Sequence, residues 1–289
     1  MLKISPIGDL IIELTEIDST NNYAMRLINE GMAEHGIVIR ADFQTHGKGQ
    51  HGNLWMAEEC KNLLISVILD TQGIAIESQF LLNVAACLSV TELLTQVYAF
   101  QDVSIKWPND IYAGKQKIAG ILIENQIRGA QWSHAVVGIG LNVNQMNFND
   151  LNRATSMALC SGKRFKLNQV LKHFIKQLNH YFVRILSNDE KLLVQYNQQL
   201  LFMGTEINYR KNFEYFKGVL QGVTEQGLIQ IMTEKKLKSF SSDLLYVCDK
   251  LIAYFNENDA VHDIRKVVQF ARANKKSSIY VLVNYFGIN

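Results

Sequence analysis

The stretch KWPNDIYAGKQKIAGILIEN, residues 106–125, predicts a strand end, a tight turn and a long second strand. Pro108, one of only two prolines in the chain, stops the preceding strand, because proline donates no ladder hydrogen bond and restricts the residue before it. A hairpin turn through Gly114 follows, and Lys117–Ile127 continues as an apolar strand. A glycine inside such a strand, here Gly120, often marks close approach of a ligand or of another backbone segment.

Four polar side chains accompany these strand ends. Asn109 and Asp110 follow Pro108 directly, so the rigid turn presents both at a fixed position. Lys106 ends one strand and Lys117 begins the next. Solvated lysines at strand ends are the ordinary explanation for each lysine by itself. Together with a loop of glycines and a lysine elsewhere in the chain, the four residues predict a pocket for a triphosphate and a second anion.

The hydrophobic pattern around this stretch predicts both strands and helices. Apolar runs predict further strands at residues 10–14, 36–43, 62–69, 103–106 and 131–144. Apolar residues at helical spacing predict helices after Asp18, over Ser78–Val97 and within Leu167–Leu200. From Met203 to Val247, short alternating runs between glycine and polar turns predict a small SH3-like β-barrel. The predicted fold class is α+β, with a mixed central β-sheet packed by helices.

These patterns divide the chain into three parts. Residues 1–200 form the predicted larger domain, and residues 201–249 form the SH3-like domain. Residues 250–289 form an extension in which a helix over Asp259–Ala273 and a strand over Ile279–Phe286 are expected. We assign this extension no function.

The stretch QTHGKGQHGNLW, residues 44–55, predicts a loop that closes over an anion. Gly47, Gly49 and Gly52 permit positive φ, so that backbone N–H groups can approach a phosphate. Lys48 adds a mobile positive charge. The letters also match the G-x-G-x-x-G of dinucleotide-binding proteins, but the next strand follows too soon for a crossover helix. A glycine-rich surface turn remains the alternative.

Asp18, Ser19 and Thr20 precede the first predicted helix, and all three residue types favour the N-cap position. Helix capping is one interpretation of the two hydroxyls. The other is that they face a pocket, together with Asn21, and hydrogen-bond a polar ligand, because a hydroxyl can both donate and accept. Both interpretations remain open.

The overall composition is that of a soluble globular protein. The chain has 289 residues, of which 48% are hydrophobic and 19% charged, and its net charge of +2 gives no reason to expect a nucleic-acid partner. Its 4 cysteines are scattered without a C-x-x-C pair, so neither a structural zinc site nor a disulfide framework is indicated. No apolar run resembles a signal peptide or a membrane span, from which we expect a cytoplasmic protein.

Five blocks of the sequence resemble the biotin protein ligase family in order and spacing: STNN at 19–22, QTHGKGQHGNLW at 44–55, KWPNDI at 106–111, QKIAGILIE at 116–124 and VVGIGLNVN at 136–144. KWPND followed by K-x-A-G-I-L-x-E is the specific part of a resemblance that covers roughly residues 10 to 250. It implies a catalytic domain of the class II aminoacyl-tRNA synthetase-like ligase fold. It also implies biotin–[acetyl-CoA-carboxylase] ligase activity. In that reaction ATP and Mg²⁺ activate biotin as biotinyl-5′-AMP, and a lysine of a biotin carboxyl carrier domain accepts the biotinyl group.

The resemblance also implies roles for individual residues. The implied biotin-binding residues are Ser19, Thr20, Asn21, Gln44, Gly47, Gly49, Gly52, Lys117 and Gly120. The implied nucleotide-binding residues are Lys48, Gln50, His51, Trp55, Lys106, Asn109, Asp110, Gly140 and Asn142. Lys117 and Lys48 are the implied catalytic residues, and Asp110 is the implied Mg²⁺ ligand. Trp55 and Trp107 would wall the pocket, with a role in the core as the alternative.

Two departures from the family pattern modify these expectations. Many relatives carry arginines where this chain has Lys48, Gln50 and His51, so phosphate binding is expected to depend on Lys48 and on the backbone. No helix-turn-helix block precedes the first motif, so we expect a ligase that does not bind operator DNA. A lipoate or octanoyl ligase of the same fold is the nearest alternative, although the KWPND block disfavours it. A non-catalytic biotin-binding protein is another alternative, and the sequence does not decide whether the chain forms a homodimer.

Overall fold

The computed structural model describes residues 6–129, 131–148, 154–211, 214–241 and 245–247. The chain forms two compact units. Of the described residues, the first unit contains 6–129, 131–148, 154–201 and 224–227, and the second contains 202–211, 214–223, 228–241 and 245–247. The predicted extension at 250–289, with its expected helix and strand, lies outside the described residues.

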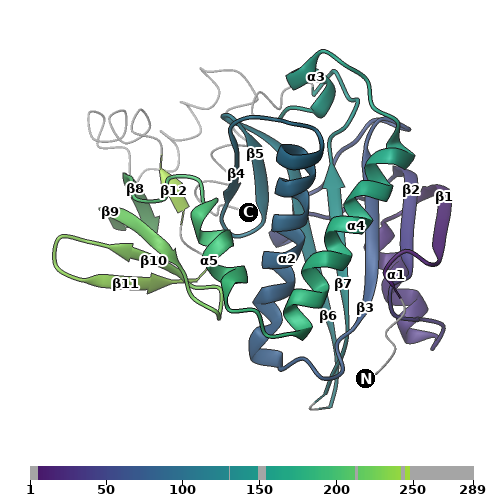
Figure 1. Ribbon diagram of the computed structural model, residues 1–289, viewed down its shortest axis with the longest axis horizontal. Coiled ribbons are helices and arrows are strands. Elements are labelled where there is room, and N and C mark those ends of the chain that lie inside the picture. The colour runs from purple at the N-terminus through teal and green to yellow at the C-terminus, as the bar shows by residue number, and fades with distance from the viewer. Residues whose placement is uncertain (1–5, 130, 149–153, 212–213, 242–244, 248–289) are drawn as a thin grey trace, which may run out of the picture. The chain divides into compact units, whose positions relative to one another are not determined.

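The first unit is built on a mixed sheet of seven strands in the order β1-β2-β3-β7-β6-β5-β4 (Figure 1). The strands are β1 (Ile11–Ile17), β2 (Val38–Gln44), β3 (Leu63–Asp70), β4 (Val103–Lys106), β5 (Asp110–Ala113), β6 (Gln116–Arg128) and β7 (Gln131–Leu141). The pair β1 and β2 is parallel, and the other neighbouring pairs are antiparallel. The predicted mixed sheet is therefore confirmed. The short strand β5, which the sequence did not predict, adds a third strand to the expected hairpin.

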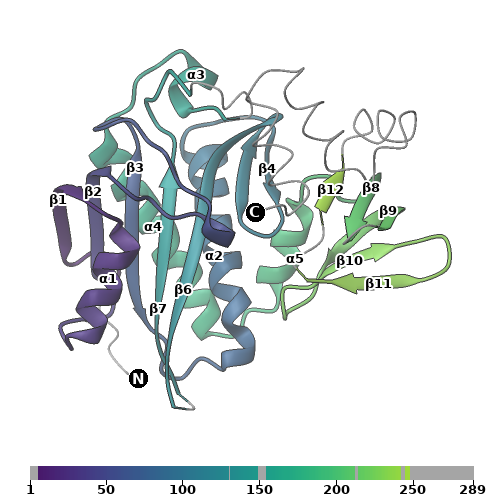
Figure 2. The same cartoon turned by 180° about the vertical axis from the view of Figure 1, so that it is seen from behind.

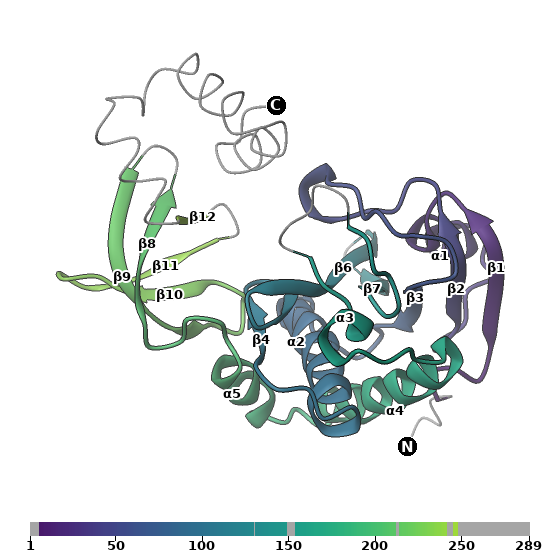
Figure 3. The same ribbon diagram turned by 90° about the horizontal axis from the view of Figure 1, so that it is seen from above.

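Helices lie on both faces of this sheet. They are α1 (Thr20–Asn29), α2 (Gln79–Glu92), α3 (Met157–Ser161), α4 (Leu167–Leu186) and α5 (Lys191–Gln198). Helix α2 packs against β6 and α4, whereas α1 packs on β2, β3 and β7 from the opposite face (Figure 3). The segment Ile76–Val97, which contains α2, is long and apolar enough to cross a membrane, but 67% of its most apolar window is buried inside the fold. It is the main core helix of this unit, as the spacing of its apolar residues predicted.

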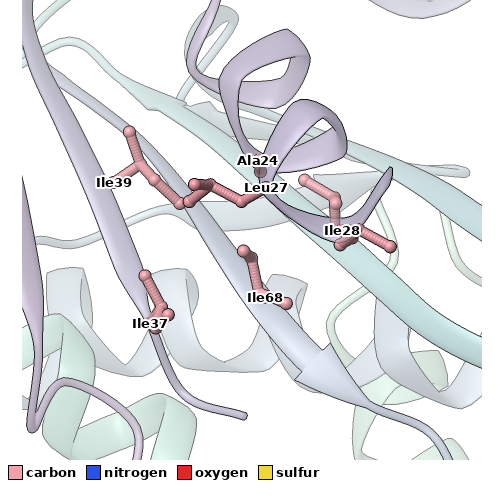
Figure 4. Packing of buried hydrophobic residues seen from close by; sticks show 7 residues of the cluster. Ala24, Leu27, Ile28, Ile37, Ile39 and Ile68 are labelled. Atoms are coloured by element: carbon pink, nitrogen blue, oxygen red, sulfur yellow. The ribbon is translucent and has the colours of Figure 1, made fainter. Parts of the chain in front are cut away.

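Helix α1 is anchored by apolar side chains on one of its faces. Ala24, Leu27 and Ile28 are buried against Ile39 of β2 and Ile68 of β3 (Figure 4). Burying a leucine or isoleucine side chain stabilises the fold by about 1.5–3 kcal/mol. This packing fixes the N-terminal end of α1, and with it the STNN motif, over the middle of the sheet.

The second unit contains a five-stranded antiparallel sheet in the order β11-β10-β9-β8-β12. Its strands are β8 (Glu206–Lys211), β9 (Glu214–Val223), β10 (Ile229–Met232), β11 (Leu237–Phe240) and β12 (Leu245–Val247). Tyr209, Leu220 and Ile231 are buried in this unit. The alternating runs therefore form strands as predicted. Closure of the sheet into an SH3-like barrel stays a prediction, because the described strands pair as an open sheet.

Candidate active site

Cross-strand pairing brings four predicted site residues into one row across the sheet. Lys106 of β4 lies opposite Asp110 of β5, Asp110 lies opposite Gly120 of β6, and Gly120 lies opposite Gly140 of β7. Directly opposed residues point to the same face of a sheet. The row therefore presents a cation and an anion beside two positions that carry no side chain.

A short ion pair lies at the charged end of this row. The Lys117 ammonium is 2.5 Å from the Asp110 carboxylate, and both side chains are partly exposed. The same ammonium lies 5.4 Å from the centre of the Trp55 ring. The Lys106 ammonium lies 5.6 Å from the centre of the Tyr112 ring. Of the predicted site residues, Lys117 and Asp110 are thus brought together by this pair.

The Trp55 indole packs directly on the backbone of the two glycines in this row, Gly120 and Gly140. A Cβ on Gly140 would lie 2.3 Å from Cε2 of Trp55, and a Cβ on Gly120 would lie 3.0 Å from Cζ3. The segment between β2 and β3 crosses the sheet here, on the face that carries α1 (Figure 2). Trp55 thus covers a strip of bare backbone, and its role in the pocket wall stays a prediction. The close approach expected at Gly120 is made by this side chain.

A second row, two residues along each strand, lies beneath the STNN motif. Gly138 of β7 is opposite Leu122 of β6 and Ser66 of β3. A Cβ on Gly138 would lie 2.2 Å from Oδ1 of Asn21, so the Asn21 amide rests directly on the backbone. Ser66, which is fully buried, donates a hydrogen bond of 2.6 Å to the same Oδ1.

Hydrogen bonds join this row to Gln44. The backbone N–H of Thr20 donates to Oε1 of Gln44 at 2.7 Å, and the Thr20 hydroxyl lies 3.0 Å from that oxygen and 2.7 Å from the Ser66 hydroxyl. Ser19 occupies the N-cap position of α1, yet its side chain makes no cap hydrogen bond. These bonds favour the interpretation in which the hydroxyls belong to a polar pocket, because neither hydroxyl caps the helix.

Glu124 connects this network to the glycine loop. One of its carboxylate oxygens accepts a 2.7 Å hydrogen bond from Asn21 Nδ2, and the other lies 3.0 Å from the Lys48 ammonium. Sequence reasoning assigned no role to Glu124, Ser66 or Gly138. Glu124 could have been noticed, because it is the one charged residue in the run IAGILIE, 118–124.

The glycine loop is held together by its own backbone. The Trp55 N–H donates to the Gly47 carbonyl at 2.8 Å, and the Gly49 N–H donates to the Asn53 carbonyl at 2.7 Å. The tip, Gln50–Gly52, forms one 3₁₀ turn. His51 and Gly52 are exposed there, and both have positive φ. The loop therefore brings Lys48 and Trp55 to the two rows, whereas His51 points into solvent-accessible space at the tip.

Three further predicted residues use their polar groups inside the fold. Asn109 donates through Nδ2 to the Ile121 carbonyl, and Asn142 donates through Nδ2 to the Thr155 carbonyl. The Asn142 Oδ1 atom is buried and has no hydrogen-bond partner in the described part of the chain, so it remains an available acceptor. Trp107 is buried and donates through Nε1 to the Gly227 carbonyl, which fits the core role left open for it.

Among the described residues, no group of three or more His, Cys, Asp or Glu side chains gathers as a metal site. Asp110 is the carboxylate beside Lys117. One carboxylate is sufficient for Mg²⁺ when phosphate oxygens and waters complete the coordination, as is usual for this ion. Asp110 therefore fits the role of a Mg²⁺ ligand beside a bound nucleotide.

The comparisons with known proteins agree with this geometry. Residues 14–142 match the model of the biotin/lipoate A/B protein ligase family. The chain is 29% identical over 252 residues, 84% of its length, to the bifunctional ligase/repressor BirA of Bacillus spizizenii, of which it covers 76%. It is 25% identical to the biotin–[acetyl-CoA-carboxylase] ligase of Mycobacterium tuberculosis over 74% of this chain and 80% of that protein.

A comparison with solved structures also finds a biotin protein ligase with a similar fold. The biotin protein ligase of Aquifex aeolicus in complex with biotin and ATP superposes with a TM-score of 0.71 at 28% identity, over 83% of this chain and 99% of that one. The mixed sheet and the glycine rows are therefore found in a chain whose fold is similar to that of a ligase that binds biotin and ATP. Residues 14–142 are thus similar to the biotin/lipoate A/B protein ligase family, and the fold is similar to that of a biotin protein ligase.

Proposed function

We propose that the protein is an ATP-dependent ligase that activates biotin as biotinyl-5′-AMP and transfers the biotinyl group to a lysine of a biotin carboxyl carrier protein. The observation that carries the proposal is one sheet face with two chemically distinct ends under one loop. One end holds the Lys117–Asp110 pair, and the other holds the neutral network of Thr20, Gln44 and Ser66. The bare glycine strip covered by Trp55 connects them.

The first step joins two anions. A carboxylate oxygen of biotin attacks the α-phosphorus of ATP, the bond to the β-phosphate oxygen breaks, and pyrophosphate leaves. No nucleophile of the enzyme takes part, so the protein contributes by positioning the reactants and by neutralising charge. We infer that Lys117 is the cation for this task, because its ammonium lies beside Asp110 and the Trp55 ring at the charged end of the site. Lys48 is paired with the Glu124 carboxylate and would have to leave it to contact a phosphate.

In the second step the amine of an acceptor lysine attacks the acyl carbon of the mixed anhydride. The bond between that carbon and the phosphate oxygen breaks, and AMP leaves. Asp110 would hold Mg²⁺, which would neutralise charge on the bound nucleotide. The neutral end of the site has the donors and acceptors that a ureido ring requires, namely the hydroxyls of Ser19 and Thr20 and the amide of Gln44.

Pyrophosphate release tests the proposal. We expect release that requires both biotin and ATP, and biotin transfer when a biotin carboxyl carrier domain is added. Lys117→Ala should lower turnover by about 10²–10³-fold, the usual effect of removing one group that stabilises developing charge. Lys115→Ala is the matched control, because Lys115 is exposed in the neighbouring turn and should retain full activity.

Two other outcomes would refute the assignment. Activity with lipoate or octanoate alone would make the protein a lipoate-type ligase, and biotin binding without pyrophosphate release would make it a non-catalytic binding protein. The expectation that the protein does not bind operator DNA and is not a repressor stays a prediction, and a gel-shift assay tests it.

A further inference from the structure

Glu124 lies outside the charged row, and its carboxylate joins two separate segments of the site. Along β6 it is four residues from Gly120, which corresponds to about 13 Å in an extended strand. Its cross-strand partner Val136 belongs to the apolar cluster beneath α1. A carboxylate at such a position costs free energy unless its oxygens are hydrogen-bonded. Both are bonded here, one to α1 and one to the glycine loop.

We propose that Glu124 is a positioning residue that ties the glycine loop to the biotin-ring end of the site. The tie runs from Lys48 in the loop, through the two carboxylate oxygens of Glu124, to the amide of Asn21. Asn21 in turn accepts from Ser66 and is seated on Gly138. In the ligand-free protein, the ion pair between Lys48 and Glu124 therefore holds the glycine loop over the sheet before a ligand binds.

The charge arrangement supports this assignment. Within the described residues of the glycine loop, Lys48 is the side chain with a permanent positive charge. The partner of Lys48 is the Glu124 carboxylate, whereas the Asp110 carboxylate pairs with Lys117. Glu124 lies about 13 Å along β6 from Gly120, the glycine beside Lys117 and Trp55. Lys117 and Lys48 are thus held at opposite ends of the site by two different carboxylates. The inference rests on the proposed function for its kinetic test, but not for its structural test.

The experiment compares Glu124→Gln with Lys48→Met and with a matched control. Glutamine keeps an acceptor for Asn21 but removes the charge that holds Lys48. Hydrogen exchange of the loop amides, without ligand, should be about fivefold faster in both variants, as expected for loss of a half-exposed ion pair. In Glu124→Gln the KM for biotin should rise by a similar factor while kcat at saturating biotin stays unchanged. Lys48→Met is compared by loop exchange alone, because Lys48 is also an implied catalytic residue. Loop exchange in the double variant should be no faster than in either single variant, because both changes break the same ion pair.

Glu13→Gln is the control, because Glu13 is also a strand glutamate in an ion pair, with Arg40 at the edge of the sheet. It should change neither loop exchange nor the KM for biotin. Unchanged loop exchange in Glu124→Gln and Lys48→Met would overturn the proposal, and so would effects that simply add in the double variant. If the wild-type protein did not ligate biotin, the proposed function would fail, while the exchange measurement would still decide the role of Glu124.

Discussion

Gly138→Ala is predicted to destabilise the protein by displacing one buried amide. The new Cβ would lie 2.2 Å from Oδ1, 2.9 Å from Cγ and 3.0 Å from Nδ2 of Asn21. Real Cβ atoms do not approach other heavy atoms so closely, so Asn21 must move by about 1 Å or more. Asn21 is only 4% exposed and is bonded on two sides, so it has no free space to enter.

The magnitude follows from the hydrogen bonds that this movement breaks. The bond from Ser66 is neutral and is worth about 1 kcal/mol, and the bond to the Glu124 carboxylate is worth about 1.5–3 kcal/mol. Their loss predicts a decrease of about 3 kcal/mol in the free energy of unfolding. At about 2–4 °C per kcal/mol for a unit of this size, the melting temperature should fall by about 6–12 °C.

Thermal unfolding of four proteins measures the effect and its cause. The wild type, Gly138→Ala, Asn21→Ala and the double variant form a cycle. Removing the Asn21 side chain leaves space for the new methyl group, so Gly138→Ala should have almost no further effect in the Asn21→Ala background. If the alanine at 138 costs the same in both backgrounds, the contact with Asn21 is not the cause and the reasoning is wrong.

Two further predictions concern Gly140, on the same face of the sheet, and the buried imidazole of His35. Gly140→Ala should displace the Trp55 indole, because the new Cβ would lie 2.3 Å from Cε2 of Trp55. Biotin-dependent pyrophosphate release should fall by at least about tenfold, while the melting temperature should change little. Unchanged activity would contradict the reasoning. Burial lowers the pKa of the His35 imidazole below its ordinary 6.5, although the nearby Asp70 carboxylate opposes the shift. The folded state therefore disfavours protonation, so the free energy of unfolding should fall as the pH drops below 6.5, and urea titrations should show a smaller loss in His35→Gln.

The elements of the first unit were largely predictable from the sequence because they depend on local patterns. The apolar stripe predicted a helix over Ser78–Val97, and the structure has α2 followed by a π-helical turn within the same limits. The strand predicted at residues 10–14 is β1, which continues to Ile17. That continuation alternates polar and apolar residues on a sheet edge, where a polar side chain gives no evidence against a strand. Tertiary pairing with β2 extends the strand beyond its apolar run.

The contacts of the site depend on register, which a single sequence does not contain. Ser66 and Asn21 are 45 residues apart in the chain, and Asn21 and Glu124 are 103 residues apart. Each pair meets only because β3, β7 and β6 align Ser66 with Gly138 and Gly138 with Leu122. The motif residues could therefore be predicted as candidates, whereas the residues that support them could not.

Successive cross-strand rows of the sheet differ in chemical character, and this difference bears on the kind of ligand that the site would bind. Residues two apart on one strand face are separated by about 7 Å. The row through Gly140 carries charges, and the row through Gly138 carries neutral donors and acceptors. Further along, Val136 belongs to the apolar cluster beneath α1 and lies opposite Glu124. A ligand with an acidic group at one end and a neutral polar ring at the other, as in the proposed function, matches the order of the first two rows. The Trp55 indole, which covers the glycines of the charged row, offers such a ligand an apolar surface beside its acidic end.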